Sequence, residues 1–212
     1  YVDIYCHHGD GVQHAFYDTG AVLTISLHES GAYLFPGTGF PQETGAGLGR
    51  GYSVNVPLYP YTTDDVYLHA FREVVPRLLE AFQPDALVTQ LGIDSHYRDP
   101  ITHMALTAQG FAEAVAEFAK LSPVKWLALG GGGYDLHAVA RAWTLAYGVM
   151  SEQEFGPEIP EPYASSYDVE ALLDPGEVEV PDQVRKDALA FADASVQAVH
   201  RIIYPAHGLQ GV

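Results

Sequence analysis

The chain has 212 residues, of which 48% are hydrophobic and 12% aromatic. This is enough to bury one sizeable core, so the composition predicts a single globular domain. A net charge of −17, from 27 acidic and 10 basic residues, argues against nucleic acid as a partner. Such a charge would attract cationic partners such as basic peptides, lysine tails or polyamines, although it also serves solubility alone.

A single cysteine, Cys6, excludes an internal disulfide and favours a reducing compartment, the cytoplasm. No stretch approaches the roughly 18 apolar residues that a membrane helix needs, so we expect no membrane partner. The chain opens at Tyr1, without a methionine, inside what looks like a core strand. We therefore expect an N-terminal part of the domain to be missing.

Short β-rich runs alternate with helical patterns along the chain. We predict strands at 1–7, 22–28, 85–92 and 124–129, and helices at 63–82, 107–121, 136–150 and about 181–203. Pro76 should kink the first of these helices or shorten it. Residues 30–60, rich in Gly, Pro and Tyr, are expected to form a long loop. The alternation predicts an α/β fold, a three-layer open parallel sheet with helices on both faces.

The amino-acid composition of the chain changes after residue 150. Residues 151–212 are rich in Pro, Glu and Ser until the last helical stretch. We therefore predict a catalytic core over residues 1–150 and a Pro-rich, acidic C-terminal extension over 151–212, which ends in a helix and packs on the same domain.

Residues that carry chemistry fall at predicted strand ends, where ligands gather in open parallel sheets. The first strand places Asp3, Tyr5 and His7 at alternate positions, and therefore on one face. The third strand ends near Asp94, and the fourth ends in four glycines followed by Tyr134. His7 and Asp94 suit a catalytic zinc, which takes three protein ligands, and Tyr134 could donate a hydrogen bond to an oxyanion. Taken singly, each residue also fits a structural role, as a core histidine or a glycine turn.

Ordered blocks of sequence resemble the histone deacetylase family. They are DI at 3–4, HHGDGV at 7–12, FY at 16–17, SLH at 26–28, FPGTG at 35–39, GAG at 45–47, VNVPL at 54–58, FQPD at 82–85, GID at 92–94 and GGGGY at 130–134. The stretch DSHYRDP at 94–100 and the acidic tail are similar to the bacterial acetoin-utilisation deacetylase branch. The resemblance is strong over residues 1–150 and loose beyond them.

The resemblance implies an arginase/deacetylase-like fold and zinc-dependent hydrolysis of an acetylated lysine, a small acetylated amine or a polyamine. His7 and Asp94 would be zinc ligands, Tyr134 the catalytic phenol, and Phe35 and Gly132 part of the substrate channel. A structural monovalent cation, usually potassium, would lie at an inner site of side-chain and main-chain oxygens from Asp3, Tyr5, His7, Ser26 and Leu27, and another at an outer site of Phe16, Thr19, Val22 and Tyr52.

Two departures from the family pattern bear on activity. Tyr5 stands where the family has a third zinc ligand, an aspartate, so zinc binding should be weak or absent. The paired histidines that serve the family as general base and electrostatic partner lie upstream of the strand that opens this chain. We therefore expect impaired hydrolysis.

Three alternatives stay open. The chain could be a non-catalytic module of deacetylase fold that binds a partner. It could be one half of a split or oligomeric protein, completed by another copy or by a complementing N-terminal segment. It could also be a ureohydrolase of the arginase type with two manganese ions, although this would need more aspartates around His7 and Asp94.

Overall fold

The structure is a computed structural model that describes residues 1–121 and 125–210. Its sheet has five parallel strands in the order β3-β2-β1-β4-β5. These strands are β1 (Val2–Asp3), β2 (Thr24–Glu29), β3 (Ser53–Leu58), β4 (Leu87–Gln90) and β5 (Trp126–Leu129). The predicted open parallel α/β sheet is confirmed, with the shortest strand, β1, at its centre.

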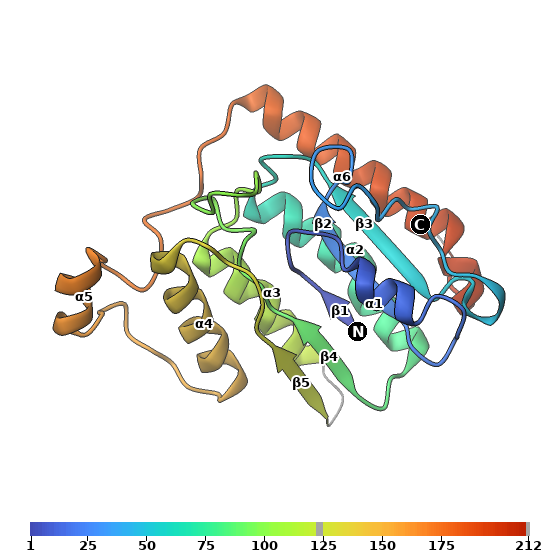
Figure 1. Cartoon of the computed structure of the whole chain (residues 1–212), viewed down its shortest axis with the longest axis horizontal. Helices are drawn as coiled ribbons and strands as arrows, with labels where there is room; N and C mark the ends of the chain where they lie inside the picture. Colours follow the sequence, from blue (N-terminus) through green and yellow to red (C-terminus); the bar gives the residue numbers. More distant parts are fainter. Residues whose placement is uncertain (122–124, 211–212) are drawn as a thin grey trace.

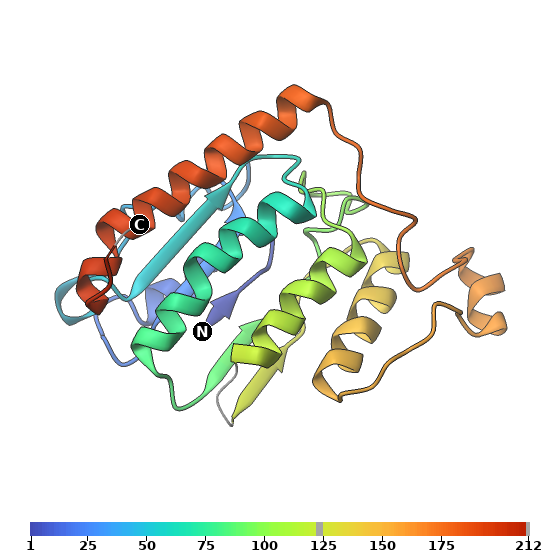
Figure 2. The same ribbon diagram turned by 180° about the vertical axis from the view of Figure 1, so that it is seen from behind.

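Helices lie on both faces of this sheet. They are α1 (Asp10–Ala15), α2 (Asp64–Phe82), α3 (Ala108–Leu121), α4 (Leu136–Met150), α5 (Glu161–Tyr167) and α6 (Asp182–Ile202), with short 3-10 turns at η1 (Gly47–Gly49) and η2 (Tyr204–His207). Figure 1 shows α1 in front of the sheet, and Figure 2 shows α2, α3 and α6 in front of the opposite face. The main core lies between that second face and its helices.

Helix α2 forms where the apolar residues recur at helical spacing. Val74, Val75 and Leu78 belong to its buried face, and Asp64 and Asp65 in its first turn complement the helix dipole. The helix does not end at Pro76, so the predicted shortening is wrong. A proline removes the hydrogen bond to the carbonyl four residues earlier, that of Arg72, and Arg72 is an exposed residue of this helix.

Part of the predicted long loop, 30–60, is a strand, so that prediction is wrong for β3. Val54, Val56 and Leu58 alternate as in a strand and are all buried. The glycines before them and Pro57 within them obscured this pattern in the sequence. Pro57 fits because β3 is an edge strand, where a residue without an N–H leaves no neighbouring strand unpaired.

Parts of residues 151–210 pack on the rest of the chain, namely α6 and the segment around Asp174, whereas α5 buries no residue. Helix α6 lies against β3 and α2, and the Ser195 hydroxyl donates to the Pro57 carbonyl at 2.7 Å. Asp174 is buried and accepts hydrogen bonds from the His96 ring, the Ala108 amide and the Arg141 guanidinium. Within the described ranges, no helix is both long and apolar enough to cross a membrane.

Candidate active site

The carboxyl ends of β1 and β4 bring His7 and Asp94 together, although 87 positions separate them in the chain. The Nδ1 atom of His7 lies 2.7 Å from Oδ2 of Asp94, and the other carboxylate oxygen accepts the Cys6 amide at 2.8 Å. Asp94 is fully buried, and 14% of the His7 side chain is exposed. Burial raises the pKa of Asp94 above its ordinary value, although hydrogen bonds from His7 and Cys6 oppose the shift. The two groups therefore form a tight, nearly dry pair.

The ring of Tyr5 fills the space beside this pair. Its centroid is 5.1 Å from that of the His7 ring. A Cβ atom added to Gly132 would lie 2.2 Å from Cε2 of Tyr5, and one added to Gly92 would lie 2.4 Å from Cδ2. The ring thus lies between two glycines, which we call the glycine cradle. A larger residue at either position would collide with the ring.

The Tyr5 hydroxyl also interacts with polar groups of the site. The side chains of Tyr134 and Asp94 both lie near it. Burial raises the pKa of Tyr5, and the charge of Asp94 raises it further. At neutral pH, Tyr5 is therefore a neutral phenol, which is a poor metal ligand compared with a carboxylate.

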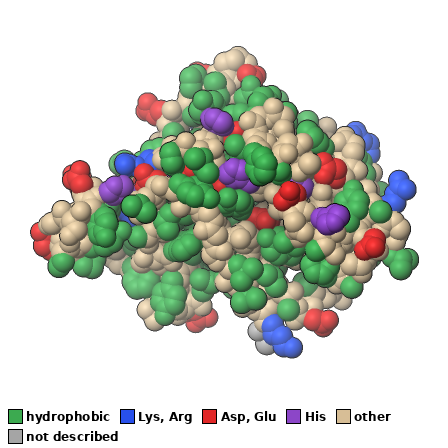
Figure 3. Space-filling model, in the orientation of Figure 1, with side chains coloured by type: hydrophobic (Ala, Val, Ile, Leu, Met, Phe, Trp, Pro, Cys, Tyr) green, Lys and Arg blue, Asp and Glu red, His purple; other side chains and the backbone are tan. Residues whose placement is uncertain are grey.

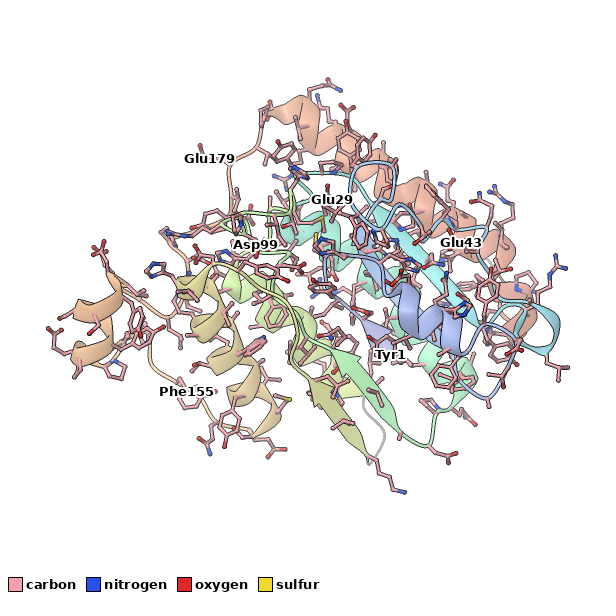
Figure 4. The ribbon with its side chains drawn as sticks, in the orientation of Figure 1. Tyr1, Glu29, Glu43, Asp99, Phe155 and Glu179 are labelled. Atoms are coloured by element: carbon pink, nitrogen blue, oxygen red, sulfur yellow. The ribbon has the colours of Figure 1, made fainter. Side chains whose placement is uncertain are left out.

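The glycine turn after β5 places Tyr134 at the same edge of the sheet. The Ile93 amide donates to the Gly132 carbonyl at 2.7 Å, which ties this turn to the loop that carries Asp94. The Tyr134 amide donates to Asp99 at 2.8 Å, and 53% of Tyr134 is exposed. In Figure 4, Asp99 lies at the carboxyl-end side of the sheet, far from Tyr1 at the amino end of β1. A phenol thus stands at the rim of the site.

The residues present do not complete a zinc site. A catalytic zinc takes three protein ligands, and His7 and Asp94 provide two. In the described part of the chain, no three His, Cys, Asp or Glu side chains are grouped so that they could hold a metal ion. The ring of Tyr5 lies beside these two residues, at the position where the sequence predicts that a third zinc ligand is missing.

The residues predicted for an inner cation site are close neighbours. Asp3 and Ser26 are register partners on β1 and β2, and both are buried. The Asp3 carboxylate accepts the Tyr1 hydroxyl at 2.8 Å and the Tyr5 amide at 2.9 Å, and in the described ranges it has no ion-pair partner. Burial raises its pKa to about 7. A buried carboxylate without a cationic side chain is suited to a monovalent cation.

The other predicted positions are more scattered. Phe35 is 80% exposed, so within this chain it stands out from the surface and is not packed against the site. Gly132 lies against Tyr5, so the space assigned to the substrate channel there is filled by that ring. Of the residues suggested for an outer cation site, Thr19 accepts the Ala21 amide and the Tyr52 carbonyl accepts the Thr24 amide.

Two residues that shape the site were not singled out from the sequence. Asp99 holds the Tyr134 amide, and the Thr102 hydroxyl donates to the Asp94 carbonyl. Both lie in the loop that follows Asp94. The Asp99-Pro100 dipeptide marks a turn, which was the one signal that could have indicated a structural role for this loop.

Comparison with known proteins identifies a family and several relatives to which the chain is similar. Residues 1–150 match the family model of the histone deacetylase domain. The chain is 46% identical over 165 residues to the acetoin utilization protein AcuC of Bacillus subtilis (strain 168), covering 76% of this chain and 43% of that protein. It is 43% identical over 161 residues to histone deacetylase 9 of Arabidopsis thaliana, covering 76% of this chain and 38% of that protein. The chain thus spans less than half the length of these relatives.

Comparison with solved structures also finds similarity to histone deacetylase homologs. A histone deacetylase homolog from Aquifex aeolicus superposes with a TM-score of 0.78 at 35% identity, over 91% of this chain and 56% of that one. A homolog solved in complex with SAHA gives 0.78 at 34% identity over the same shares. The parallel sheet, the ordered sequence blocks and the matched domain all lead to one conclusion. The chain belongs to the histone deacetylase family.

Proposed function

We propose that this chain carries part of the active site of a zinc-dependent deacetylase that releases acetate from an acetylated amine, and that Tyr5 severely impairs hydrolysis in this form. The observation that carries the proposal is the placement of Tyr5. Its ring stands beside His7 and Asp94, between Gly92 and Gly132 and near the Tyr134 side chain.

The chain's own residues support binding and orientation more than turnover. The Tyr134 phenol can donate a hydrogen bond to a carbonyl oxygen, and the Asp99 carboxylate fixes the backbone that carries this phenol. When bound, zinc would supply Lewis acidity to such a site. Because His7 and Asp94 are its only two ligands here, no catalytic step through zinc follows from this chain as it stands.

The substrate class comes from the family and stays a proposal. One solved homolog binds SAHA, which supports an acetyl-lysine-like chain as ligand. A protein lysine, a small acetylated metabolite and an acetylated polyamine are the alternatives. We also propose a cytoplasmic location, and a boundary at residue 150 between the deacetylase core and the C-terminal extension.

The proposal is tested with this 212-residue chain and its Tyr5→Asp variant. Zinc content after dialysis and hydrolysis of an acetyl-lysine peptide are measured for both, with Tyr5→Phe as the matched control. We expect close to one zinc per chain only in Tyr5→Asp, and no zinc gain in Tyr5→Phe, which removes the hydroxyl but supplies no carboxylate. Zinc-dependent turnover by the unmodified chain at the rate of Tyr5→Asp would contradict the proposal.

A second candidate is a non-catalytic binding module. The direct contact of 2.7 Å between His7 and Asp94 favours it, because each ligand atom already has a protein partner. Binding of an acetyl-lysine peptide by the unmodified chain, in the presence of a chelator and without hydrolysis, would favour this candidate over an impaired enzyme.

We propose a structural potassium ion near Asp3, Ser26 and the main-chain oxygen of Leu27. It would neutralise a carboxylate that is 2% exposed. Replacing potassium with N-methylglucamine at constant ionic strength should lower the melting temperature of the chain by several degrees. In Asp3→Asn this dependence should disappear, and an equal dependence in both proteins would count against the site.

A further inference from the structure

Two hollows separate the loop that follows Asp94 from the C-terminal extension. The larger has a volume of about 560 Å³ and lies between this loop and residues 178–184. The smaller has a volume of about 280 Å³ and lies between the same loop and residues 168–175. Tyr97 lines both hollows, so they adjoin, and we name them together the rim groove.

The extension wall of the rim groove has the features of an unpaired strand. Glu177 and Glu179 are exposed, whereas Val178 and Val180, which line the larger hollow, are half-buried. Such alternation is the pattern of an extended chain. In the described part of the chain, no main-chain hydrogen bond joins residues 176–180 to another residue. Because free main-chain groups along an extended segment accept a further strand, a polypeptide can pair here.

The extension wall is also negatively charged. Residues 142–184 contain no Lys or Arg, whereas Asp and Glu recur along them. Two arginines border the groove, and each is held by a carboxylate, Arg98 by Asp135 at 3.3 Å and Arg141 by Asp174 at 2.8 Å. Within the described ranges, four acidic residues along this wall form no ion pair: Asp168, Glu170, Glu177 and Glu179.

These charges lie on one side of the molecule. Figure 3, in the orientation of Figure 1, shows red acidic side chains around α5 and at the edge above it, with a small group of blue basic side chains between them. In Figure 4, Glu179 stands out from the connection that leads to α6. The groove therefore attracts cationic ligands.

The core wall of the rim groove is aromatic and firmly held. Tyr61 is 51% exposed and Tyr97 is 37% exposed. The His103 ring lies edge-on to Tyr61, and its Nδ1 atom lies 2.8 Å from the carboxylate of Glu29, which is fully buried. Exposed aromatic rings beside carboxylates accommodate the apolar stems and the charged heads of Lys and Arg. A wall that is already ordered lowers the entropy lost on binding.

The rim groove lies next to the candidate active site. Arg98, which lines the smaller hollow, donates to Asp135, the residue that follows Tyr134. Thr102, which lines the larger hollow, donates its hydroxyl hydrogen to the Asp94 carbonyl. A polypeptide in the groove would therefore bring its neighbouring residues close to Tyr134.

We propose that the rim groove binds an Arg- or Lys-rich stretch of a protein substrate, which pairs with residues 177–180 as a strand and lies beside the acetylated lysine. This inference rests on the deacetylase function proposed above, and it selects a protein from the three substrate classes left open there. The extension wall lies beyond residues 1–150, which match the family model, so the site is one that the C-terminal extension adds to the domain.

A polyamine fits the rim groove less well. It would match the negative charge, but it has no main chain to pair with residues 177–180 and no side chains to place against Val178 and Val180. A small neutral metabolite would use neither the charge nor the free main chain. A protein substrate is the ligand that uses the charge, the apolar lining and the unpaired segment together.

The first experiment measures binding apart from hydrolysis. A fluorescent Arg-rich peptide without acetyl-lysine is titrated with the 212-residue chain in the presence of a chelator, and fluorescence anisotropy gives the Kd. Glu177→Gln/Glu179→Gln should weaken binding about five-fold or more, because it removes two carboxylates beside the groove. The matched control is Glu152→Gln/Glu154→Gln, which removes the same charge from exposed residues outside the groove and should leave the Kd unchanged.

The peptide itself tests the strand pairing. N-methylation at alternate residues removes main-chain donors, and in one of the two possible registers it should weaken binding about ten-fold or more. Hydrogen exchange at residues 177–180 should slow in the complex. Equal binding of both methylated peptides, without any change in exchange at residues 177–180, would overturn the proposal.

Two further outcomes of the titration would also overturn the proposal. Equal weakening by the two double variants, with circular dichroism showing both folded, would mean that net charge alone explains binding. Spermidine that binds as tightly as the peptide, with the same dependence on Glu177 and Glu179, would assign the groove to a small polyamine.

A second experiment connects the groove to hydrolysis in zinc-loaded Tyr5→Asp. Adding Glu177→Gln/Glu179→Gln should raise KM for an acetyl-lysine peptide with flanking arginines about five-fold and leave kcat unchanged. KM for an uncharged acetyl-lysine peptide should not change, and an equal rise for both peptides would contradict the groove's role. Absence of hydrolysis by Tyr5→Asp would contradict the proposed function, whereas the titration would still decide the groove, so the two failures are distinguishable.

Discussion

At the scale of single residues, the size of the side chain at position 5 decides what the site can hold. A phenyl ring occupies a cradle between Gly92 and Gly132 and places no anionic oxygen next to His7 and Asp94. A carboxylate there would be smaller and would complete the three ligands that a catalytic zinc requires. The residue at position 5 thus determines both how the site is packed and how many zinc ligands it offers.

The cradle can be tested by a double-mutant cycle. Gly132→Ala puts a methyl group 2.2 Å from the Tyr5 ring, so we expect it to destabilise the chain by about 1–3 kcal/mol. In the Tyr5→Asp background the ring is gone, and the same substitution should cost clearly less. Urea denaturation of the four proteins measures both costs. Equal costs in the two backgrounds would show that the ring does not pack there.

Much of the site could be anticipated from the sequence. The parallel sheet predicts that His7, Asp94 and Tyr134 meet, because carboxyl ends of parallel strands share one edge. The positions of the Tyr5 ring and of Phe35 could not be anticipated, since they depend on which space the tertiary packing leaves. Asp99 was missed for a related reason, because its partner is a backbone amide and backbone partners leave no sequence pattern.

At the scale of elements, Asp174 joins the C-terminal extension to the core. Burial alone would raise the pKa of Asp174, but hydrogen bonds from His96 and the Ala108 amide, with the charge of His96 and the hydrogen bond from Arg141, lower it below its ordinary value. A depressed carboxyl pKa stabilises the fold at pH values above the unfolded pKa of about 4, and this stability is lost as the pH falls through the folded value.

Asp174→Asn should therefore destabilise the chain by about 3–5 kcal/mol near neutral pH, because it leaves Arg141 buried without its anion. The difference from the unmodified chain should stay large above about pH 4 and shrink below it, as the wild-type carboxylate is protonated. Urea denaturation as a function of pH measures this. A difference that grows on acidification would contradict the assigned direction of the pKa shift.

The contact between α2 and α3 depends on a glycine. Asp64, in the first turn of α2, accepts the amide and hydroxyl of Thr107 at 2.9 and 2.6 Å, and a Cβ on Gly110 would lie 2.0 Å from its carboxylate. Gly→Ala inside a helix ordinarily stabilises by about 1 kcal/mol. We expect Gly110→Ala to destabilise instead, as measured by thermal unfolding, with Gly156→Ala, which meets nothing within 4 Å, as the neutral control. A gain in stability for Gly110→Ala would contradict this packing.

The elements were predictable where periodicity was strong. The long helices α2, α3, α4 and α6 follow apolar repeats that the sequence shows directly. The short elements have no such repeat, so the sequence did not predict them. Strand β3 was hidden by neighbouring glycines, α1 buries no residue, and α5 lies in a Pro-rich stretch. Residue 124, the predicted start of the last strand, lies outside the described residues.

At the scale of the whole molecule, helices α2, α3 and α6 cover one face of the sheet, whereas the opposite face is exposed at β5. The face under α2, α3 and α6 holds the core, whereas Leu127 and Leu129 of β5 and Trp143 and Tyr147 of α4 are exposed. Composition alone predicted one domain but could not indicate which surface is uncovered, because that depends on strand order. The order β3-β2-β1-β4-β5 places β5, with its apolar residues, at an edge.

We propose that the residue at position 5 controls whether His7 and Asp94 hold an ion. The most direct measurement is a calorimetric zinc titration of the unmodified chain, Tyr5→Asp and Tyr5→Asp/Asp94→Asn under identical conditions. We expect tight 1:1 binding by Tyr5→Asp alone, with affinity lower by at least two orders of magnitude in the other two proteins, because each lacks one of three ligands. Equally tight binding by the unmodified chain and by Tyr5→Asp would contradict it.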